Sequence, residues 1–526
     1  MRKILQVIFV LIFSGNYVSA QEPVIEWQHV YDSLGPTTFF DIQKTSDNGF
    51  LLAGCQDYDL QFTTSRIAGM YFAPASVYKI DSTGNLKRYF IAWPGINNYY
   101  SVIPLPGDKC IGGGYNYDDF SGGSALVEKV ALTNGAGTPE WSNRYGGSLD
   151  DRAYSLQATN DNGLVFAGYT YSTDGNVTGN HGSCDMWIGK CDGLGNLQWQ
   201  KCVGGTAADT AFSIIQLADG SYVIAGTTTS NNGDVTSNAG NADAWLVKLD
   251  VSGNLVWQKT FGGSGNDGFK KLQVANDGGI IAVGYTYSND GVVSNNHGNA
   301  DVWVVKCDNN GVLQWQKSYG GSAEDRGNDI KPVAGGGYII NGYTRSADGD
   351  IRNNNGQADQ WIVKILNNGV IEWTKSIGTA NGEYGTAILP MDNSQVLAVA
   401  TRETASDRFA VVTKLGPLNE ITGSVFANAN GVKDANERFL NTGIISQLYP
   451  NPAKGSVSLK LQGPIHDKVS IQLIDQQGRP LFLKQFDAQQ TNELVIPLNT
   501  GMLTAGYYVL QITVGEKKYL QKLIVQ

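Results

Sequence analysis

The chain repeats itself every 58 residues across its central part. Tryptophans recur at this spacing in two series, Trp141, Trp199, Trp257, Trp315 and Trp373, and Trp187, Trp245, Trp303 and Trp361. Acidic residues and glycines keep the same period, at Asp151, Asp209, Asp267, Asp325 and Glu383 and at Gly168, Gly226, Gly284 and Gly342. Repeats of this length bury their apolar faces against one another. The chain must therefore fold as an array of similar units.

Each unit has the pattern of four short strands. In the unit from Asp325 to Ile377, a first segment precedes three β-branched and aromatic runs at 337–346, 359–369 and 370–378, which are bounded by Gly, Asn and Asp. Asn368-Gly369 predicts a tight hairpin between the third and fourth strands. Four antiparallel strands in such a unit are typical of a β-propeller blade.

Seven blades can be counted. Four units are nearly identical, a fifth at 386–414 is degenerate, and two more precede them around 49–81 and 109–141. The last unit lacks a Trp strand, whereas the sequence VIEWQHVYD near the N-terminus offers one with Trp27. We predict that this N-terminal strand completes the seventh blade, because a closed ring leaves no unpaired strand edge.

The N-terminus has the pattern of a secretory signal peptide, residues 1–20. Arg2 and Lys3 precede an apolar run at 4–13 and a small-residue cleavage site at 18–20. That run is shorter than the roughly 20 residues a membrane span needs, and we predict no transmembrane segment. The net charge of −10 argues against nucleic acid as a partner. A disulfide among Cys184, Cys191 and Cys202 stays open as an alternative.

The repeat ends near residue 415, so we assign 21–420 to the propeller, 421–447 to a linker and 448–526 to a separate domain. Six strand-like runs between 456 and 525 predict a small Ig-like β-sandwich. The fold class is thus all-β, a seven-bladed β-propeller followed by this sandwich.

Four motifs of the last domain carry a family resemblance: LYPNPAKG (448–455), DQQGRPL (475–481), LTAGYYVLQI (503–512) and KLIVQ (522–526). Together they resemble the type A sorting domain of the type IX secretion system. The resemblance implies export to the periplasm, passage across the outer membrane by the type IX machinery acting on 448–526, and a location at the cell surface or in the medium. It also implies a source among the Bacteroidota.

The linker contains the segment ANANGVKDANE, which aligns with the later part of an EF-hand-like calcium loop. Its ligand places hold Asn428, Asn430, Asp434 and Glu437. The first ligand place holds Phe426, which cannot coordinate a cation. Two interpretations stay open, a calcium site and an Asn-rich linker. We predict no other cofactor.

Four aspartates two residues before a repeated tryptophan are candidates for a structural role: Asp185, Asp243, Asp301 and Asp359. A residue present in blade after blade serves what every blade needs, which is packing. We therefore interpret them as hydrogen-bond anchors between blades rather than metal ligands.

The first two blades depart from the shared pattern, with an insertion at 56–74 and the segments WPGINNYY (93–100) and YNYDDFSGG (115–123). We interpret these as loops whose clustered aromatic rings suit sugars or peptides. The candidate ligand-binding residues are Tyr58, Tyr71, Phe72, Trp93, Tyr99, Tyr100, Tyr115, Tyr117, Asp118, Asp119 and Phe120.

The sequence contains no familiar catalytic motif. The four histidines have no metal-ligand spacing, and no serine lies in a GxSxG motif. The favoured hypothesis is a secreted or surface propeller, without enzymatic activity, that binds an extracellular glycan or protein. Two alternatives remain, a polysaccharide-active enzyme whose acids meet at the propeller axis and a passive structural or adhesion component.

Overall fold

The computed structural model describes residues 22–416, except 33–34, 36, 57–73, 93–95, 119–121, 133–134, 138, 335, 392–394 and 406. It also describes 445–525, except 455, 466–467, 475–479, 487–490, 500–502, 504–505 and 515–516. The chain divides into two compact units, Met1–Leu418 and Asn419–Gln526. Every regular element among the described residues is a strand, which confirms the all-β prediction.

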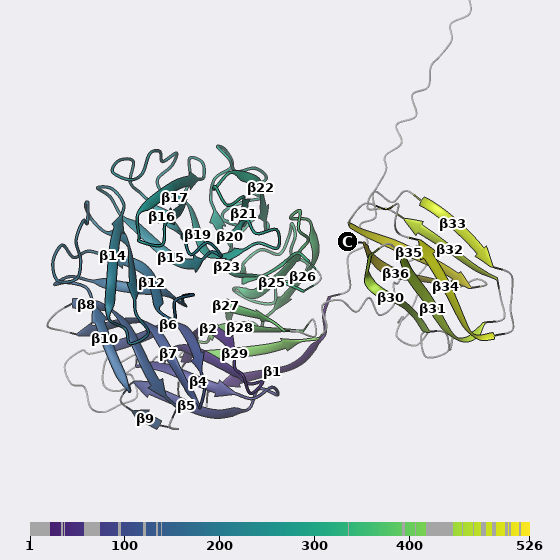
Figure 1. The fold of residues 1–526 in the computed structure, drawn as a ribbon, viewed down its shortest axis with the longest axis horizontal. Helices are drawn as coiled ribbons and strands as arrows, with labels where there is room; N and C mark the ends of the chain where they lie inside the picture. The colour runs from purple at the N-terminus through teal and green to yellow at the C-terminus, as the bar shows by residue number, and fades with distance from the viewer. Residues whose placement is uncertain are drawn as a thin grey trace, which may run out of the picture. The chain divides into compact units, whose positions relative to one another are not determined.

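The first unit is a ring of seven sheets, as the repeat predicts. Four sheets are alike and contain four antiparallel strands in chain order (Figure 1). Blade 3 contains β11 (Asp151–Ala158), β12 (Leu164–Thr170), β13 (Asp185–Cys191) and β14 (Leu197–Val203). Blade 4 contains β15 (Asp209–Gln216), β16 (Tyr222–Thr228), β17 (Asp243–Leu249) and β18 (Leu255–Phe261). Blade 5 contains β19 (Asp267–Val274), β20 (Ile280–Thr286), β21 (Asp301–Cys307) and β22 (Leu313–Tyr319). Blade 6 contains β23 (Asp325–Pro332), β24 (Tyr338–Thr344), β25 (Asp359–Ile365) and β26 (Ile371–Ile377).

The first two blades keep this plan with changes at their edges. Blade 1 contains β2 (Thr37–Lys44), β3 (Phe50–Gln56), β4 (Ala75–Ile80) and β5 (Leu86–Ala92), with β9 (Gly135–Gly137) added parallel to β5. Blade 2 contains β6 (Ile96–Leu105), β7 (Lys109–Asp118), β8 (Gly122–Ala131) and β10 (Trp141–Tyr145). The innermost strands β2, β6, β11, β15, β19, β23 and β27 contact one another in a closed cycle.

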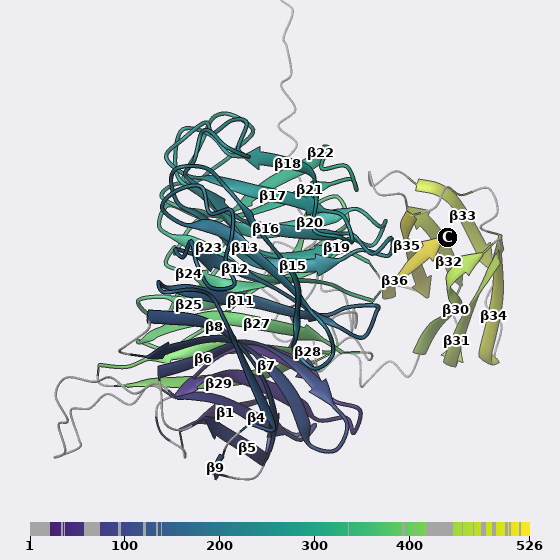
Figure 2. The same ribbon diagram turned by 60° about the vertical axis from the view of Figure 1, so that its left-hand side comes forward.

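The seventh blade closes the ring with the N-terminal strand. It contains β27 (Gly382–Pro390), β28 (Val396–Glu403), β29 (Arg408–Leu415) and β1 (Ile25–Tyr31). Strand β1 lies beside β29 (Figure 2). The two strands pair antiparallel, which places Trp27 opposite Lys414. The same Trp–Lys register joins the outer strands of the regular blades, as in Trp199 opposite Lys190. This pairing confirms the predicted closure.

Outer-strand tryptophans pack against a glycine of the next blade at five boundaries, those of Trp27, Trp141, Trp199, Trp257 and Trp315. A Cβ on Gly253 would come within 2.9 Å of the Trp199 ring, and one on Gly84 within 2.9 Å of the Trp27 ring. Both glycines lie in hairpin turns with positive φ, near 84° and 86°, which glycine adopts without strain. Trp27 therefore makes the same inter-blade contact as the repeated tryptophans.

Two buried carboxyl groups meet at each boundary between regular blades. Asp185 in blade 3 and Asp209 in blade 4 are both 0% exposed. Oδ2 of Asp185 accepts hydrogen bonds from the backbone N (3.1 Å) and Nδ1 (2.6 Å) of His181, within its own blade, while its Oδ1 has no partner. The interpretation of these aspartates as hydrogen-bond anchors between blades was therefore wrong, because the bonds hold a loop of the same blade.

One set of hydrogen bonds that cross between blades is accepted by the side chain of the residue after the bulge in an inner strand. Oδ2 of Asp41 accepts from the backbone N of Val102 at 2.9 Å, and Oδ2 of Asp329 accepts from that of Ile388 at 2.9 Å. Serines fill the equivalent place in other blades, as where Ser155 accepts from the backbone N of Ile214 at 3.3 Å. These bonds join neighbouring inner strands around the axis.

All six cysteines are buried, and the disulfide considered among Cys184, Cys191 and Cys202 is not formed. Cys191 and Cys307 end the third strands of their blades, where Leu249 and Ile365 stand in the neighbouring units. They act as small apolar core residues, a common role for a buried thiol.

The second unit is a β-sandwich, as predicted. Its strands are β30 (Ile445–Lys454), β31 (Ser456–Ile465), β32 (Val469–Ile474), β33 (Pro480–Phe486), β34 (Thr491–Asn499), β35 (Gly506–Val514) and β36 (Lys517–Val525). The order β33-β32-β35-β36 forms one layer and β30-β31-β34 the other, joined where Ala453 pairs with Val525. Alternate residues of both layers form one apolar core, as the period of a half-buried strand requires.

Candidate binding site at the propeller axis

Every inner strand carries a β-bulge at the same place. The pairing register shifts between Phe39 and Asp41 in β2, and at the equivalent point in the six other inner strands. The seven bulged residues, which we call the axial ring, are Phe40, Tyr100, Tyr154, Phe212, Lys270, Asn328 and Thr386. All seven are half-buried. Bulges re-aim a side chain and recur beside functional sites.

Four consecutive members of the axial ring are aromatic and in contact, and we call them the aromatic arc. The ring centroids of Phe40 and Tyr100 lie 4.8 Å apart, and those of Tyr100 and Tyr154 lie 4.9 Å apart. Tyr154 and Phe212 follow at 5.3 Å. Burial raises the pKa of the Tyr154 hydroxyl, so it stays protonated and can donate a hydrogen bond. The arc is an apolar surface with two hydroxyl groups.

The remaining three members are polar. Lys270 places Nζ 3.6 Å from the centroid of the Phe212 ring, a cation–π contact that joins it to the aromatic arc. Asn328 donates from Nδ2 to the carbonyl of Gly385 at 2.8 Å. Burial, together with the nearby Arg326, lowers the pKa of Lys270 to about 8. The axial ring therefore joins an aromatic half to a half with one cation.

Two arginines flank the axial ring on the inner strands, two residues before a bulge. Arg152 stacks over Tyr115 of the preceding blade at 4.4 Å, and Arg326 stacks over Tyr285 in the same way at 4.4 Å. Each is also ion-paired, Arg152 with Asp150 at 3.1 Å and Arg326 with Glu324 at 2.6 Å. These clusters keep the rings and charges beside the axis in a defined arrangement.

Two of the sequence-predicted ligand residues belong to this region. Tyr100 is in the axial ring, and Tyr115 stacks on it with centroids 6.1 Å apart and planes at 19°. They lie on strands β6 and β7 rather than on loops, so the interpretation of 96–100 and 115–118 as loop was wrong. Isoleucine and tyrosine favour strands, and here they extend both strands of blade 2.

The other predicted residues divide into three groups. Tyr99 has no exposed surface and hydrogen-bonds the carboxylate of Glu128 in the core, so it cannot contact a ligand and is withdrawn from the candidate site. Tyr117 is 41% exposed, and Asp118 ends β7. The rest lie outside the described residues: Tyr58, Tyr71, Phe72, Trp93, Asp119 and Phe120, with the calcium-loop candidates Asn428, Asn430, Asp434 and Glu437.

Sequence reasoning missed Phe40, Tyr154, Phe212 and Lys270. The repeat nevertheless contains a usable signal for three of them. The position of Tyr154 holds Phe212, Lys270, Asn328 and Thr386 in the following units, whereas the acidic residue three places before it and the leucine or isoleucine two places after it are kept in all five. A position that changes character in every unit has no packing role common to all blades.

The axial ring contains no carboxylate, as its seven residues are all described. The nearby acids Asp150 and Glu324 are ion-paired with the flanking arginines. The described part of the chain also contains no group of three His, Cys, Asp or Glu residues able to hold a metal ion. The acid pair expected of a glycosidase is therefore not found at this position.

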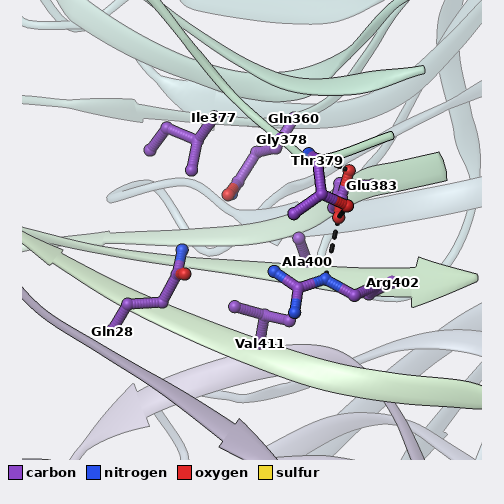
Figure 3. A pocket seen from close by; sticks show the side chains of 9 residues that line it. All are labelled: Gln28, Gln360, Ile377, Gly378, Thr379, Glu383, Ala400, Arg402 and Val411. Atoms are coloured by element: carbon purple, nitrogen blue, oxygen red, sulfur yellow. Dashed lines mark hydrogen bonds and ion pairs between the residues drawn. The ribbon is translucent and has the colours of Figure 1, made fainter. Parts of the chain in front are cut away.

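A small cavity lies where blade 7 meets blade 6. Glu383 and Arg402 form an ion pair of 2.8 Å in its wall, and Gln28 of the closing strand faces it (Figure 3). Its volume is about 40 Å³, far below the roughly 300–1,000 Å³ of typical ligand pockets. We assign this cavity to the closure of the ring and not to ligand binding.

Comparison with known proteins identifies the C-terminal region. Residues 447–526 match the family described as the secretion system C-terminal sorting domain. This confirms the predicted type IX sorting domain and makes the chain a protein with an export signal at its C-terminal end. None of the described residues form a helix with the length and hydropathy of a membrane span.

The chain is distantly similar to a curated protein and to several solved structures. Regulatory protein FlaEY of Caulobacter vibrioides is 25% identical over 198 residues, which are 35% of this chain and 20% of that protein. The chain thus spans a fifth of that relative's length.

Among solved structures, PorZ, a surface component of the type IX secretion system of Porphyromonas gingivalis, is 12% identical over 93% of this chain and 82% of its own, with a TM-score of 0.22. A glycoside hydrolase is 9% identical over 93% and 95%, with a TM-score of 0.27. TM-scores this low carry no functional information about this chain.

Proposed function

We propose that this exported protein is a binding module that holds an extracellular glycan or protein at the axis of its propeller. The observation that carries the proposal is the axial ring, in which one strand position is aromatic in four consecutive blades and polar in the other three. In a ring built from near-identical blades, this position is free to serve a ligand.

The aromatic arc favours a glycan. Three successive ring contacts of 4.8–5.3 Å form a continuous apolar surface that suits the C–H faces of a sugar. The hydroxyls of Tyr100 and Tyr154 and the amide of Asn98, which donates to the Tyr100 hydroxyl at 3.3 Å, offer partners for sugar hydroxyl groups.

The protein acts at the cell surface or in the medium, delivered there by residues 448–526. The sorting-domain family supports this location. Deleting 448–526 should leave the propeller folded and retained in the periplasm, since the two units have separate cores. Fractionation of cells that express both forms measures this, and a truncated form that still reaches the surface would remove the proposed route.

A glycan array probed with the purified full-length protein tests the binding function. We expect a restricted set of glycans to bind, and Phe212→Ala to lose them because it removes one end of the arc. Product analysis of each bound glycan separates binding from cleavage, and a cleaved product would favour the polysaccharide-active enzyme. An array without any hit, together with a protein partner that ignores Phe212→Ala, would favour a passive surface component.

A further inference from the structure

Lys270 differs from the other cations near the axis because no anion accompanies it. Arg152 and Arg326 each hold a carboxylate, at 3.1 and 2.6 Å. Lys270, by contrast, contacts the face of Phe212 and has no acidic partner among the described residues. No other member of the axial ring is charged. The axis therefore carries one cation whose natural counter-charge the described chain does not supply.

This arrangement costs stability unless a ligand compensates for it. Burial disfavours the charged form of Lys270 and lowers its pKa to about 8, and the positive charge of Arg326 acts in the same direction. A methionine would fill the same space without that cost. A half-buried charge that has no opposite charge beside it, and that packing does not require, is typical of a site for a charged ligand.

The surroundings of Lys270 select the kind of anion. The chain has 48 acidic and 38 basic residues, so a highly charged polyanion is repelled by most of its surface. A short ligand with only a few carboxylates is repelled far less than a long polyanion and gains the attraction of the Lys270 charge. The aromatic arc begins directly beside it at Phe212 and accepts a ring on its apolar face.

We propose that the ligand is a glycan with a carboxylate-bearing sugar, a uronic acid, whose carboxylate binds Lys270 while its ring lies against the aromatic arc. This inference rests on the proposed axial binding function and narrows it to one class of sugar. Lys270 acts here as the specificity-determining residue, and the arc provides most of the contact area.

The test compares trigalacturonate with its methyl ester, by calorimetry on the full-length protein. Trigalacturonate should bind at least about tenfold more tightly than the ester, because a charge-assisted contact is lost on esterification. Lys270→Met should abolish this difference. Lys259→Met is the matched control, since Lys259 is an exposed outer-strand lysine of blade 4 and its loss changes the net charge equally.

A second readout reports on Lys270 itself. With its lysines reductively ¹³C-methylated, the protein should show a raised Lys270 pKa in saturating trigalacturonate and no change in the ester. Equal binding of both sugars, lost in Phe212→Ala but not in Lys270→Met, would overturn the inference and leave the axial binding function standing. Binding of neither sugar, or of an acidic peptide in their place, would overturn it as well.

Discussion

The blade interfaces and the axial ring differ in how far their residues are repeated from blade to blade. At the interfaces the same residue returns in blade after blade, and Trp187, Trp245, Trp303 and Trp361 are each at most 1% exposed. At the axis one structurally equivalent position holds phenylalanine, tyrosine, lysine, asparagine and threonine in different blades. The tryptophans lie on the third strand of each blade and the axial residues on the innermost strand. In both cases the pairing of the strands determines the direction in which the side chain points.

The difference shows where this fold can vary. A buried tryptophan fills a space that its neighbouring blade defines, so any change leaves a cavity or an overlap. A bulged axial residue projects from the sheet toward its neighbours around the axis and toward the second strands, as where Tyr100 stacks on Tyr115. Interfaces therefore determine stability, and the axial ring is available for recognition. The following predictions test that division.

The largest effect should come from removing the closing strand. Deletion of residues 22–31 exposes β29 as an unpaired edge and removes the Trp27–Gly84 contact with blade 1. We expect the ring to lose cooperative unfolding and to aggregate, as measured by circular dichroism on heating and by light scattering. A monomer with an unchanged melting curve would mean that β1 is not part of the ring's structural closure.

Truncating one interface tryptophan should also lower the free energy of unfolding, but by less than deletion of the closing strand. Trp303 is fully buried, stacks on Phe269 at 5.6 Å and donates from Nε1 to Gln316 at 2.8 Å. Trp303→Ala should reduce the free energy of unfolding by about 3–5 kcal/mol, the usual cost of removing a buried large aromatic. Denaturant unfolding measures this. The half-buried Trp315→Ala serves as control and should cost less.

The carboxyl pairs at the interfaces should make stability depend on pH. Burial raises the pKa of Asp185 and of Asp301 to about 6, and the acids Asp209 and Asp325 of the next blades add to the shift. The folded state therefore takes up protons before the unfolded state does, so stability should rise as the pH falls from 7.5 through 6. His181 and His297 face the same carboxyls and oppose the shift.

Replacing both aspartates by asparagine tests this contribution. Asparagine carries no charge, and its amide can place an NH2 donor where Oδ1 of each aspartate has no partner. D185N/D301N should therefore be more stable than the wild type at pH 7.5 by about 1–3 kcal/mol per site. The double variant should also lose much of the pH dependence between 5 and 7.5. Asp192→Asn, at an exposed hairpin turn, should not change that dependence. A wild type with the same free energy of unfolding at pH 5 and at pH 7.5 would contradict the proposed effect of the buried carboxyl pairs on stability.

Sequence reasoning predicted the repeated part of the molecule because repetition reports packing. The seven blades, the closing strand and the Trp27 register all follow from residues that return at one spacing. The sorting domain was predictable because its motifs span the whole domain.

The site was harder to predict because a bulge breaks the alternation of a strand. Tyr99 and Tyr100 are adjacent and chemically identical, yet one is in the core and the other is in the axial ring. Their assignment depends on the register shift between Tyr99 and Ser101, which pairing with β7 determines. No local pattern in the sequence marks that shift, so aromatic residues on strands were interpreted as loop residues.

The most direct test measures stability and ligand affinity together in two variants, Trp303→Ala and Tyr154→Ala, with a glycan identified on the array. Tyr154 is half-buried, so its truncation should lower the free energy of unfolding by less than about 2 kcal/mol. Its affinity should fall at least about thirtyfold, as for a hot-spot aromatic. Trp303→Ala should lose about 3–5 kcal/mol of stability and, while folded, keep its affinity. Full affinity in Tyr154→Ala, or lost affinity in folded Trp303→Ala, would contradict the division between packing interfaces and a recognising axis.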